Sequence, residues 1–127
     1  MKALVVEDDQ VHRLFLEKML EPFGEIHVAE NGREALDSFI QAMVDNEPFN
    51  LVCLDIAMPE MDGLETLKQI RKVETQKKDQ RVKVIMTTGH DEGGNVAEAF
   101  LSQCDAYLLK PVDRSLLLRN LQDFGLV

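Results

Sequence analysis

Apolar and polar residues follow two patterns along the chain, short apolar runs and segments in which apolar residues recur every three or four positions. The short runs predict five strands, at Lys2–Val6, Glu25–Ala29, Leu51–Leu54, Val82–Thr87 and Ala106–Leu109. The intervening segments predict five helices, over about Gln10–Phe23, from Asn31 to the polar stretch Asp45–Pro48, and over Asp62–Val73, Val96–Ser102 and Asp113–Phe124. Because strands and helices alternate, we expect an α/β fold in which helices cover both faces of a parallel sheet.

The composition of each strand indicates its place in the sheet. The first, third and fourth runs are apolar throughout, as expected of strands buried on both faces, and are predicted to be internal. The run Glu25–Ala29 instead alternates polar and apolar residues, which suits a strand nearer an edge. Spacing alone leaves the strand order open. In the first helix, the apolar residues with helical spacing are Val11, Leu14, Phe15, Met19 and Leu20.

Length and charge restrict the possible functions. The chain has 127 residues, and we expect one domain over residues 1–127. Its formal net charge of −9 disfavours direct binding to nucleic acid or to an anionic membrane. The apolar runs fall far short of the roughly 18 residues of a membrane span, and the first residues do not resemble a signal peptide. Cys53 lies inside an apolar run and Cys104 precedes another, and both are expected to be buried free thiols of a cytoplasmic protein. One basic group is predicted to be a solvated loop: Arg71, Lys72, Lys77, Lys78, Arg81 and Lys83.

Polar side chains follow four of the predicted strands at the point where each strand ends. They are Glu7-Asp8-Asp9, Asp55, Thr87-Thr88 and Lys110-Pro111. Open parallel α/β sheets form their sites at the carboxyl ends of strands, so we expect these side chains to lie close together. Carboxylates, a hydroxyl and a lysine gathered there can hold a divalent cation and a phosphoryl group.

Each residue type has a specific chemical use at such an edge. The carboxylate of Asp55 can act as a nucleophile and form an acyl phosphate. Glu7 and Asp8 are oxygen ligands suited to Mg²⁺ or Mn²⁺, whereas Asp9 suits the N-cap of the following helix. Lys110 can bridge to Asp55 and to a phosphoryl oxygen. Each of these residues is also common without any function, so the argument depends on the combination.

Together, in this order, these residues resemble the receiver domain of two-component response regulators over essentially the whole chain. The similarity is carried by Leu4-Val5-Val6-Glu7-Asp8-Asp9, Leu54-Asp55-Ile56-Ala57-Met58-Pro59-Glu60-Met61-Asp62-Gly63, Met86-Thr87-Thr88-Gly89 and Ala106-Tyr107-Leu108-Leu109-Lys110-Pro111. The resemblance implies a flavodoxin-like, doubly wound sheet of five parallel strands in the order 2-1-3-4-5, with five helices.

The resemblance also implies a phosphorylation switch. Asp55 would accept a phosphoryl group from a phosphohistidine on a sensor histidine kinase or a phosphotransfer protein. Mg²⁺ (or Mn²⁺) would be held by Glu7, Asp8, Asp55 and the backbone carbonyl of Ala57. Lys110 would contact the phosphoryl group and Thr88 would close on it.

Further residues would complete the switch and set its lifetime. Tyr107 would reorient as Thr88 moves, remodelling the face made by the fourth helix, fifth strand and fifth helix. Ala57 and His90, two residues after Asp55 and Thr88, occupy positions that tune hydrolysis, and they predict slow to intermediate self-dephosphorylation. Gly89 departs from the alanine of many receivers and should leave the phosphoryl site open.

Three classes of function are compatible with parts of this pattern: a phosphorylation switch, an interaction module and an enzyme. The leading one is a stand-alone response regulator that binds an unknown downstream protein, as a monomer or weak homodimer, with autocatalytic phosphotransfer but no metabolic enzyme activity. A relay intermediate, which passes the phosphoryl group to another protein, fits equally well with the site residues. A phosphorylation-independent interaction module is disfavoured because the acid pair, Asp55 and Lys110 are all present. A phosphatase of the haloacid dehalogenase type is disfavoured because Ala57 stands where a second acid is needed.

Overall fold

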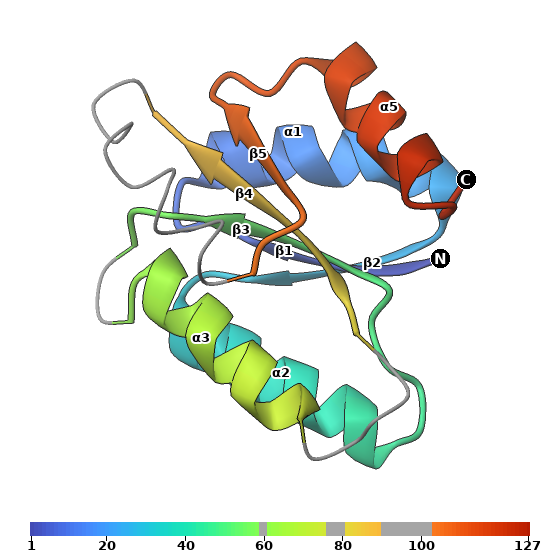
Figure 1. Ribbon diagram of the computed structural model, residues 1–127. Helices are drawn as coiled ribbons and strands as arrows, with labels where there is room; N and C mark the ends of the chain where they lie inside the picture. The colour runs from blue at the N-terminus through green and yellow to red at the C-terminus, as the bar shows by residue number, and fades with distance from the viewer. Residues whose placement is uncertain (59–60, 76–80, 90–102) are drawn as a thin grey trace.

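A five-stranded parallel sheet forms the centre of the molecule (Figure 1). The computed structural model describes residues 1–58, 61–75, 81–89 and 103–127. The strands are β1 (Lys2–Val6), β2 (Glu25–Ala29), β3 (Leu51–Asp55), β4 (Lys83–Thr88) and β5 (Ala106–Leu109). Their order is β2-β1-β3-β4-β5, and every neighbouring pair is parallel. The predicted order is therefore confirmed, as are the internal positions of β1, β3 and β4.

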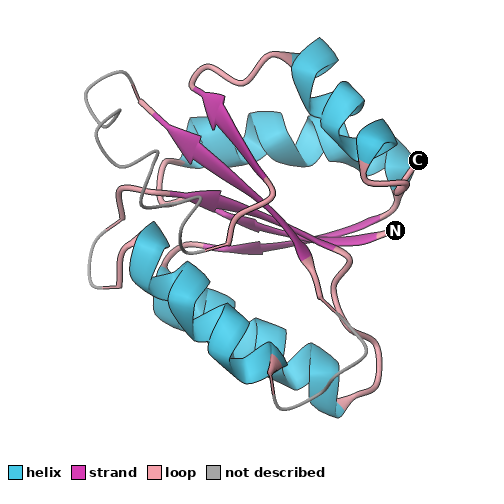
Figure 2. Ribbon diagram, in the orientation of Figure 1, coloured by secondary structure: helices cyan, strands magenta, loops and turns pink. Residues whose placement is uncertain are grey.

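Helices cover both faces of the sheet, as Figure 2 shows by secondary structure. They are α1 (Gln10–Leu20), which continues into the 3₁₀ turn η1 (Glu21–Phe23), α2 (Gly32–Val44), α3 (Gly63–Glu74) and α5 (Arg114–Asp123). The helices α1 and α5 lie on one face, and α2 and α3 lie on the other. The predicted helix over Val96–Ser102 lies outside the described residues. The doubly wound architecture agrees with the resemblance.

Polar caps fix where the described α-helices begin. Asp9, Asn31, Asp62 and Asp113 each accept hydrogen bonds from backbone N–H groups in the first turn of the helix that follows. An N-cap side chain satisfies N–H groups that have no partner within the helix, which stabilises the helix end by about 1 kcal/mol. The cap predicted at Asp9 is confirmed, and the helices predicted from Asn31 and Asp113 begin directly after these residues. Asp9 is thereby engaged away from the acid pair.

Alternation along the internal strands divides the core into two clusters, one on each face. The cluster under α2 and α3 contains Leu4, Val52, Leu54, Val84 and Met86. The cluster under α1 and α5 contains Val5, Cys53, Ile85, Leu108 and Leu117. Because successive strand residues point to opposite faces, both faces are buried, which explains the uninterrupted apolar runs.

The outward faces of α1 and α5 are more apolar than the sequence pattern indicates. Val11, Leu14 and Phe15, which have helical spacing, are 60%, 52% and 56% exposed. Of the same set, Leu20 is buried and Met19 is partly buried against the core, and Leu16, outside the set, is buried as well. The spacing therefore identified only part of the buried face. Leu116 of α5 is also exposed, at 49%.

Among its described residues, the basic group predicted to be solvated contains one buried member. Arg71 is 8% exposed and pairs with Glu74 at 2.7 Å and with Asp105 at 2.9 Å. Its guanidinium also donates to the carbonyl oxygens of Val82 and Gln103. The prediction of a solvated side chain was wrong for Arg71, because its partner Asp105 lies 34 residues away in the sequence and only the fold brings the two together.

The two cysteines and the lengths of the helices agree with the sequence. Cys53 and Cys104 are buried free thiols, and desolvation raises their pKa values to about 12 and about 11. Within the ranges that the structure describes, no helix has both the length and the apolar character needed to cross a lipid bilayer.

Candidate functional site

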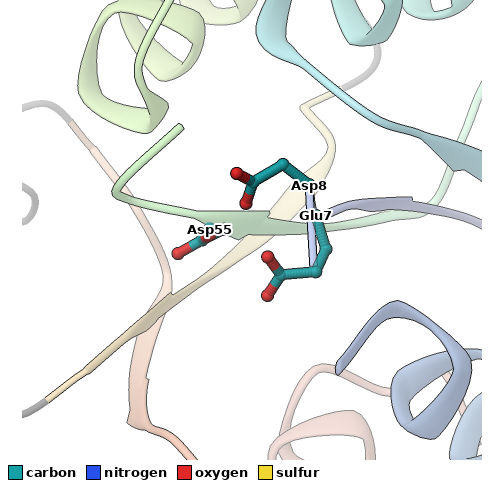
Figure 3. Close-up of side chains that lie close together, drawn as sticks. All are labelled: Glu7, Asp8 and Asp55. Atoms are coloured by element: carbon teal, nitrogen blue, oxygen red, sulfur yellow. The ribbon is translucent and has the colours of Figure 1, made fainter. Parts of the chain in front are cut away.

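The carboxyl ends of β1, β3 and β5 bring the acidic residues and the lysine together. Glu7 and Asp8 directly follow β1, and Asp55 is the last residue of β3. Val6 pairs with Leu54 in the register of these two strands, so the three acids sit at the same edge. Figure 3 shows their carboxylates pointing toward a common space at the ends of β1 and β3. One carboxylate oxygen from each residue lies within 4.8 Å of the others.

The three carboxylates differ strongly in burial. Glu7 is completely buried, Asp55 is 2% exposed, and Asp8 is exposed. A ligand that enters the cluster therefore meets Asp8 at the surface, while Glu7 and Asp55 form the floor. Rigid strand ends hold the two buried acids, which limits how far they can separate to reduce their repulsion.

Lys110 is the cation of the cluster. Its Nζ lies 2.6 Å from Oε1 of Glu7 and 3.1 Å from Oδ1 of Asp55. The predicted bridge to Asp55 is present, and the shorter contact, to Glu7, was not predicted. The backbone of Lys110 is fixed by an N–H donated to the carbonyl of Thr88 at 2.7 Å, and the following bond to Pro111 is cis.

The electrostatics of the cluster follow from burial and from the shared cation. Burial and the neighbouring Glu7 carboxylate raise the pKa of Asp55 to about 7. Burial and Glu7 also raise the pKa of Asp8. Burial opposes ionisation of Glu7, but hydrogen bonds with Asp55 and Lys110 outweigh it and lower the pKa of Glu7. For Lys110 burial likewise favours the neutral form, but Glu7 and Asp55 outweigh it and raise the pKa.

Three carboxylates around one ammonium group leave negative charge to be compensated. Burial is the largest cause of the raised pKa of Asp55 and the Glu7 carboxylate adds to it, so a cation bound beside Asp55 would lower this pKa. Oxygen ligands at this spacing suit a hard divalent ion such as Mg²⁺, which binds through a few carboxylates and keeps open positions for water or phosphate. The residues present therefore fit the predicted cation.

The turn after Asp55 is held against the start of α3. The N–H of Gly63 donates to the carbonyl of Ile56 at 3.0 Å, and the N–H of Ala57 lies 3.3 Å from Oδ1 of Asp55. A Cβ atom at Gly63 would lie 2.2 Å from the backbone oxygen of Asp55 and 2.7 Å from Cα of Ile56. Only glycine permits this approach, so α3 supports the backbone of the candidate nucleophile. Ala57 is exposed, and its methyl side chain offers no hydrogen bond.

The predicted switch residues lie on β4 and β5. Thr88 is completely buried at the end of β4, and its hydroxyl donates to the carbonyl of Gly89 at 3.1 Å. Tyr107 is half-buried, pairs with Met86 across β4 and β5, and packs against the cluster under α2 and α3. A Cβ atom at Gly89 would meet no described residue within 4 Å. His90 lies outside the described residues.

Two residues of α1 approach the cluster and were not singled out from the sequence. His12 places Nδ1 4.0 Å from Oε1 of Glu7 and 3.8 Å from Oδ2 of Asp9. Arg13 donates from Nη1 to the backbone carbonyl of Glu7 at 3.0 Å. Because Asp9 caps α1, residues one turn later face back toward the end of β1, so this spacing was an available signal.

Known proteins resemble the chain along almost its full length. Its residues 3–122 match the family model described as "Response regulator receiver domain". The chemotaxis protein CheY of Listeria monocytogenes is 33% identical over 124 residues, which are 96% of each chain. Three other curated relatives, 30% to 36% identical, are far longer, and the chain spans 3%, 23% and 12% of their lengths.

Solved structures agree with this assignment. The receiver domain of the histidine kinase CKI1 from Arabidopsis thaliana, complexed with Mg²⁺ and BeF₃⁻, superposes with a TM-score of 0.80 at 31% identity, covering 98% of this chain and 89% of that one. The Ssk1 receiver domain of Saccharomyces cerevisiae, crystallised with the phosphotransfer protein Ypd1, gives a TM-score of 0.82 at 27% identity, with coverages of 98% and 88%. By sequence, fold and site geometry, the chain belongs to the response regulator receiver domain family of two-component signalling.

Proposed function

We propose that Asp55 accepts a phosphoryl group from a phosphohistidine on a histidine kinase or phosphotransfer protein. The observation that carries the proposal is the placement of a nearly fully buried Asp55 beside Lys110, at 3.1 Å, and within the group of three carboxylates. A nucleophile, a cation for the phosphoryl oxygens and ligands for a metal ion thus converge at one sheet edge. The receiver domains of CKI1 and Ssk1 support the two parts of the proposal, since the first is complexed with Mg²⁺ and BeF₃⁻ and the second with a phosphotransfer protein.

In the proposed reaction, a carboxylate oxygen of Asp55 attacks phosphorus and forms an acyl phosphate. The P–N bond to the donor histidine breaks, and its electron pair stays on the imidazole nitrogen. Lys110 stabilises the charge on the transferring phosphoryl oxygens, so catalysis depends on positioning and electrostatics. Glu7, Asp8, Asp55 and the carbonyl of Ala57 would hold Mg²⁺, which supplies further charge neutralisation when bound.

The acyl phosphate would act as the switch signal. It adds negative charge and acceptor oxygens at Asp55, to which the hydroxyl of Thr88 moves from the carbonyl of Gly89. Tyr107 lies beside β4 and would reorient into the space that Thr88 leaves. On the described part of the proposed output face, Leu109 and Leu116 are exposed at 52% and 49%, and they would contact the downstream partner.

The donor protein must reach Asp55 across the surface that borders the site, and α1 offers an apolar face there. A small pocket connects α1 with the acid cluster. Phe15 and Leu16 of α1 line this pocket together with Glu7, Lys110 and Val112. We therefore assign the exposed face formed by Val11, Leu14 and Phe15, here called the α1 face, to docking of the phosphohistidine donor. This role explains why three large apolar side chains remain exposed on one helix.

The stand-alone regulator and the relay intermediate use the same chemistry and differ in what receives the signal. Either is proposed to work in the cytoplasm, where the two buried thiols stay reduced. The charge of −9 does not favour a direct nucleic-acid partner, so the output is proposed to be a protein. A role independent of phosphorylation is the alternative that the following experiment separates.

The experiment is intact-mass measurement after incubation with acetyl phosphate and Mg²⁺, for the wild type and for Asp55→Asn. We expect one added phosphoryl group on the wild type, and none on the variant or in the presence of EDTA. Phosphoryl addition that is equal in Asp55→Asn would contradict the assignment of Asp55. No addition from acetyl phosphate or from phosphorylated histidine donors would favour the phosphorylation-independent role.

A further inference from the structure

Thr87 is a buried residue of the site that has no part in the reaction described above. It is the penultimate residue of β4 and is 1% exposed. Its backbone carbonyl accepts from the N–H of Ile56 at 3.0 Å, but within the described ranges its hydroxyl has no hydrogen-bond partner. Most buried polar groups in proteins are paired, so an unpaired one at a site requires an explanation.

The position of Thr87 in the sheet relates it to the reacting groups. Ile85, two residues earlier, belongs to the cluster under α1 and α5. Residues two apart in a strand share a face, so Thr87 lies on that same face. By the same rule, three site residues lie on this face, because each comes two positions after a member of that cluster. Glu7 follows Val5, Asp55 follows Cys53, and Lys110 follows Leu108. Thr88 lies on the opposite face.

Thr87 also lies between the nucleophile and the lysine. The order β3-β4-β5 puts β4 in the middle. The register pairs Thr87 with Asp55 on one side and with Leu108 on the other, and Lys110 is two residues beyond Leu108. The hydroxyl of Thr87 therefore lies on β4, between the strands that carry Asp55 and Lys110, and on the same face as these two side chains.

We propose that Thr87 is a positioning residue that holds Lys110 in place during phosphoryl transfer. This inference rests on the proposed function. Before transfer, the shortest contact of Lys110 is to Glu7, at 2.6 Å. Transfer adds oxygens at Asp55, and the ammonium turns from Glu7 toward them. The oxygen of the Thr87 hydroxyl then accepts a hydrogen bond from one of the three N–H groups of Lys110. This bond fixes the direction of the ammonium group.

A purely structural role accounts poorly for this residue. A strand interior favours β-branched residues, but valine has the same shape and would bury no polar atom. Replacing a buried, unpaired hydroxyl by a methyl group of the same shape is neutral or stabilising. The chain thus has a hydroxyl where packing alone favours valine, as expected of a group used only in the loaded site.

The test compares Thr87→Val and Thr87→Ser with the wild type. We expect Thr87→Val to unfold in urea at the same or a higher midpoint, and yet to take up a phosphoryl group from acetyl phosphate about tenfold more slowly, as expected when a hydrogen bond to a charged group is lost. Thr87→Ser, which keeps the hydroxyl, should stay within about twofold of the wild-type rate. If Thr87→Ser, with its smaller side chain, keeps the wild-type rate, the effect of Thr87→Val comes from loss of the hydroxyl and not from a change in packing.

The outcomes separate this inference from the proposed function. If the wild type takes up no phosphoryl group from any donor, both fail. If the wild type is phosphorylated and Thr87→Val matches its rate, only the role of Thr87 is overturned. Equal slowing of the Val and Ser variants would also overturn it, because the hydroxyl would then not be the cause.

Discussion

At the level of single residues, the chemistry of the site depends on unequal burial of three neighbouring carboxylates. Asp55 is buried and close to Glu7, and the pair shares one lysine. Ionisation of Asp55 therefore costs free energy in the metal-free protein, which corresponds to its raised pKa. A divalent cation that occupies the cluster would relieve this repulsion.

The raised pKa of Asp55 predicts how Asp55→Asn changes stability with pH. Between its ordinary pKa of 3.8 and about 7, folded Asp55 keeps a proton that the unfolded chain releases, so its contribution to stability falls as the pH rises through this window. Asparagine cannot ionise. In metal-free buffer we expect the variant to exceed the wild type in unfolding free energy by on the order of 2 kcal/mol at pH 8, and by less at pH 5.

Urea denaturation at the two pH values measures this difference. Asp37→Asn is the control, because Asp37 is exposed on α2, and it should change stability equally little at both pH values. A variant that is less stable than the wild type at pH 8 would show that ionised Asp55 is well compensated in the folded protein.

Gly63 provides a second test at the residue scale. In Gly63→Ala the new methyl group meets the backbone of Asp55 at 2.2 Å, so the turn has to move. We expect a loss of about 1–3 kcal/mol in unfolding free energy and slower phosphorylation, because the nucleophile shifts with the turn. Gly89→Ala is the matched control, since its Cβ meets no described residue within 4 Å, and it should stay within about 0.5 kcal/mol. Equal effects of the two alanines would contradict the role of Gly63.

At the level of elements, the apolar runs and caps made the described strands and helices predictable. Strands buried on both faces appear as continuous apolar runs, and Asp9, Asn31 and Asp113 mark the helix starts. The faces of α1 and the burial of Arg71 were not predictable, since each depends on what the fold places opposite. For the same reason, the contact of Lys110 with Glu7 could not be deduced from residues 103 positions apart.

The α1 face predicts a variant that separates docking from chemistry. Leu14→Asp places a charge in the proposed docking surface at a 52% exposed residue, whereas Phe15 lines the pocket that Glu7 and Lys110 also line. We expect transfer from a phosphohistidine donor to slow about tenfold or more, as for loss of a central apolar interface contact, while the rate with acetyl phosphate stays within about twofold. Rates are compared by intact mass with a donor that phosphorylates the wild type.

The control for this variant is Val44→Asp, which introduces the same charge at a 70% exposed residue at the end of α2. It should leave both rates unchanged. If Leu14→Asp slows the acetyl phosphate reaction as much as the donor reaction, the effect lies in the site and not in docking.

At the level of the whole molecule, the fold gathers residues from three strand ends into one acidic cluster in a protein of net charge −9. The position of this cluster was predictable because the carboxyl ends of parallel strands share an edge. The distances within it were not, since they depend on strand register and on the tight turn at Gly63. Because the cluster exists only in the folded chain, a cation that binds there is linked to the stability of the entire domain.

This linkage predicts that Mg²⁺ stabilises the domain. A ligand at a hundredfold excess over its Kd adds about 2.7 kcal/mol to the unfolding free energy when it binds only the folded state. We expect the urea midpoint to rise with Mg²⁺ and to return with EDTA, and the rise to shrink in Asp8→Asn, whose exposed side chain leaves the core intact. An equal rise in the wild type and in Asp8→Asn would place the cation elsewhere.

The central claim is that Asp55 forms the acyl phosphate, and borohydride trapping tests it most directly. Borohydride reduces an aspartyl phosphate to homoserine, which peptide mass mapping locates at a single position. After incubation with acetyl phosphate and Mg²⁺, we predict homoserine at position 55, and none there without the phosphodonor. Homoserine at Asp8 instead, or no conversion in a protein that has gained phosphoryl mass, would contradict the account.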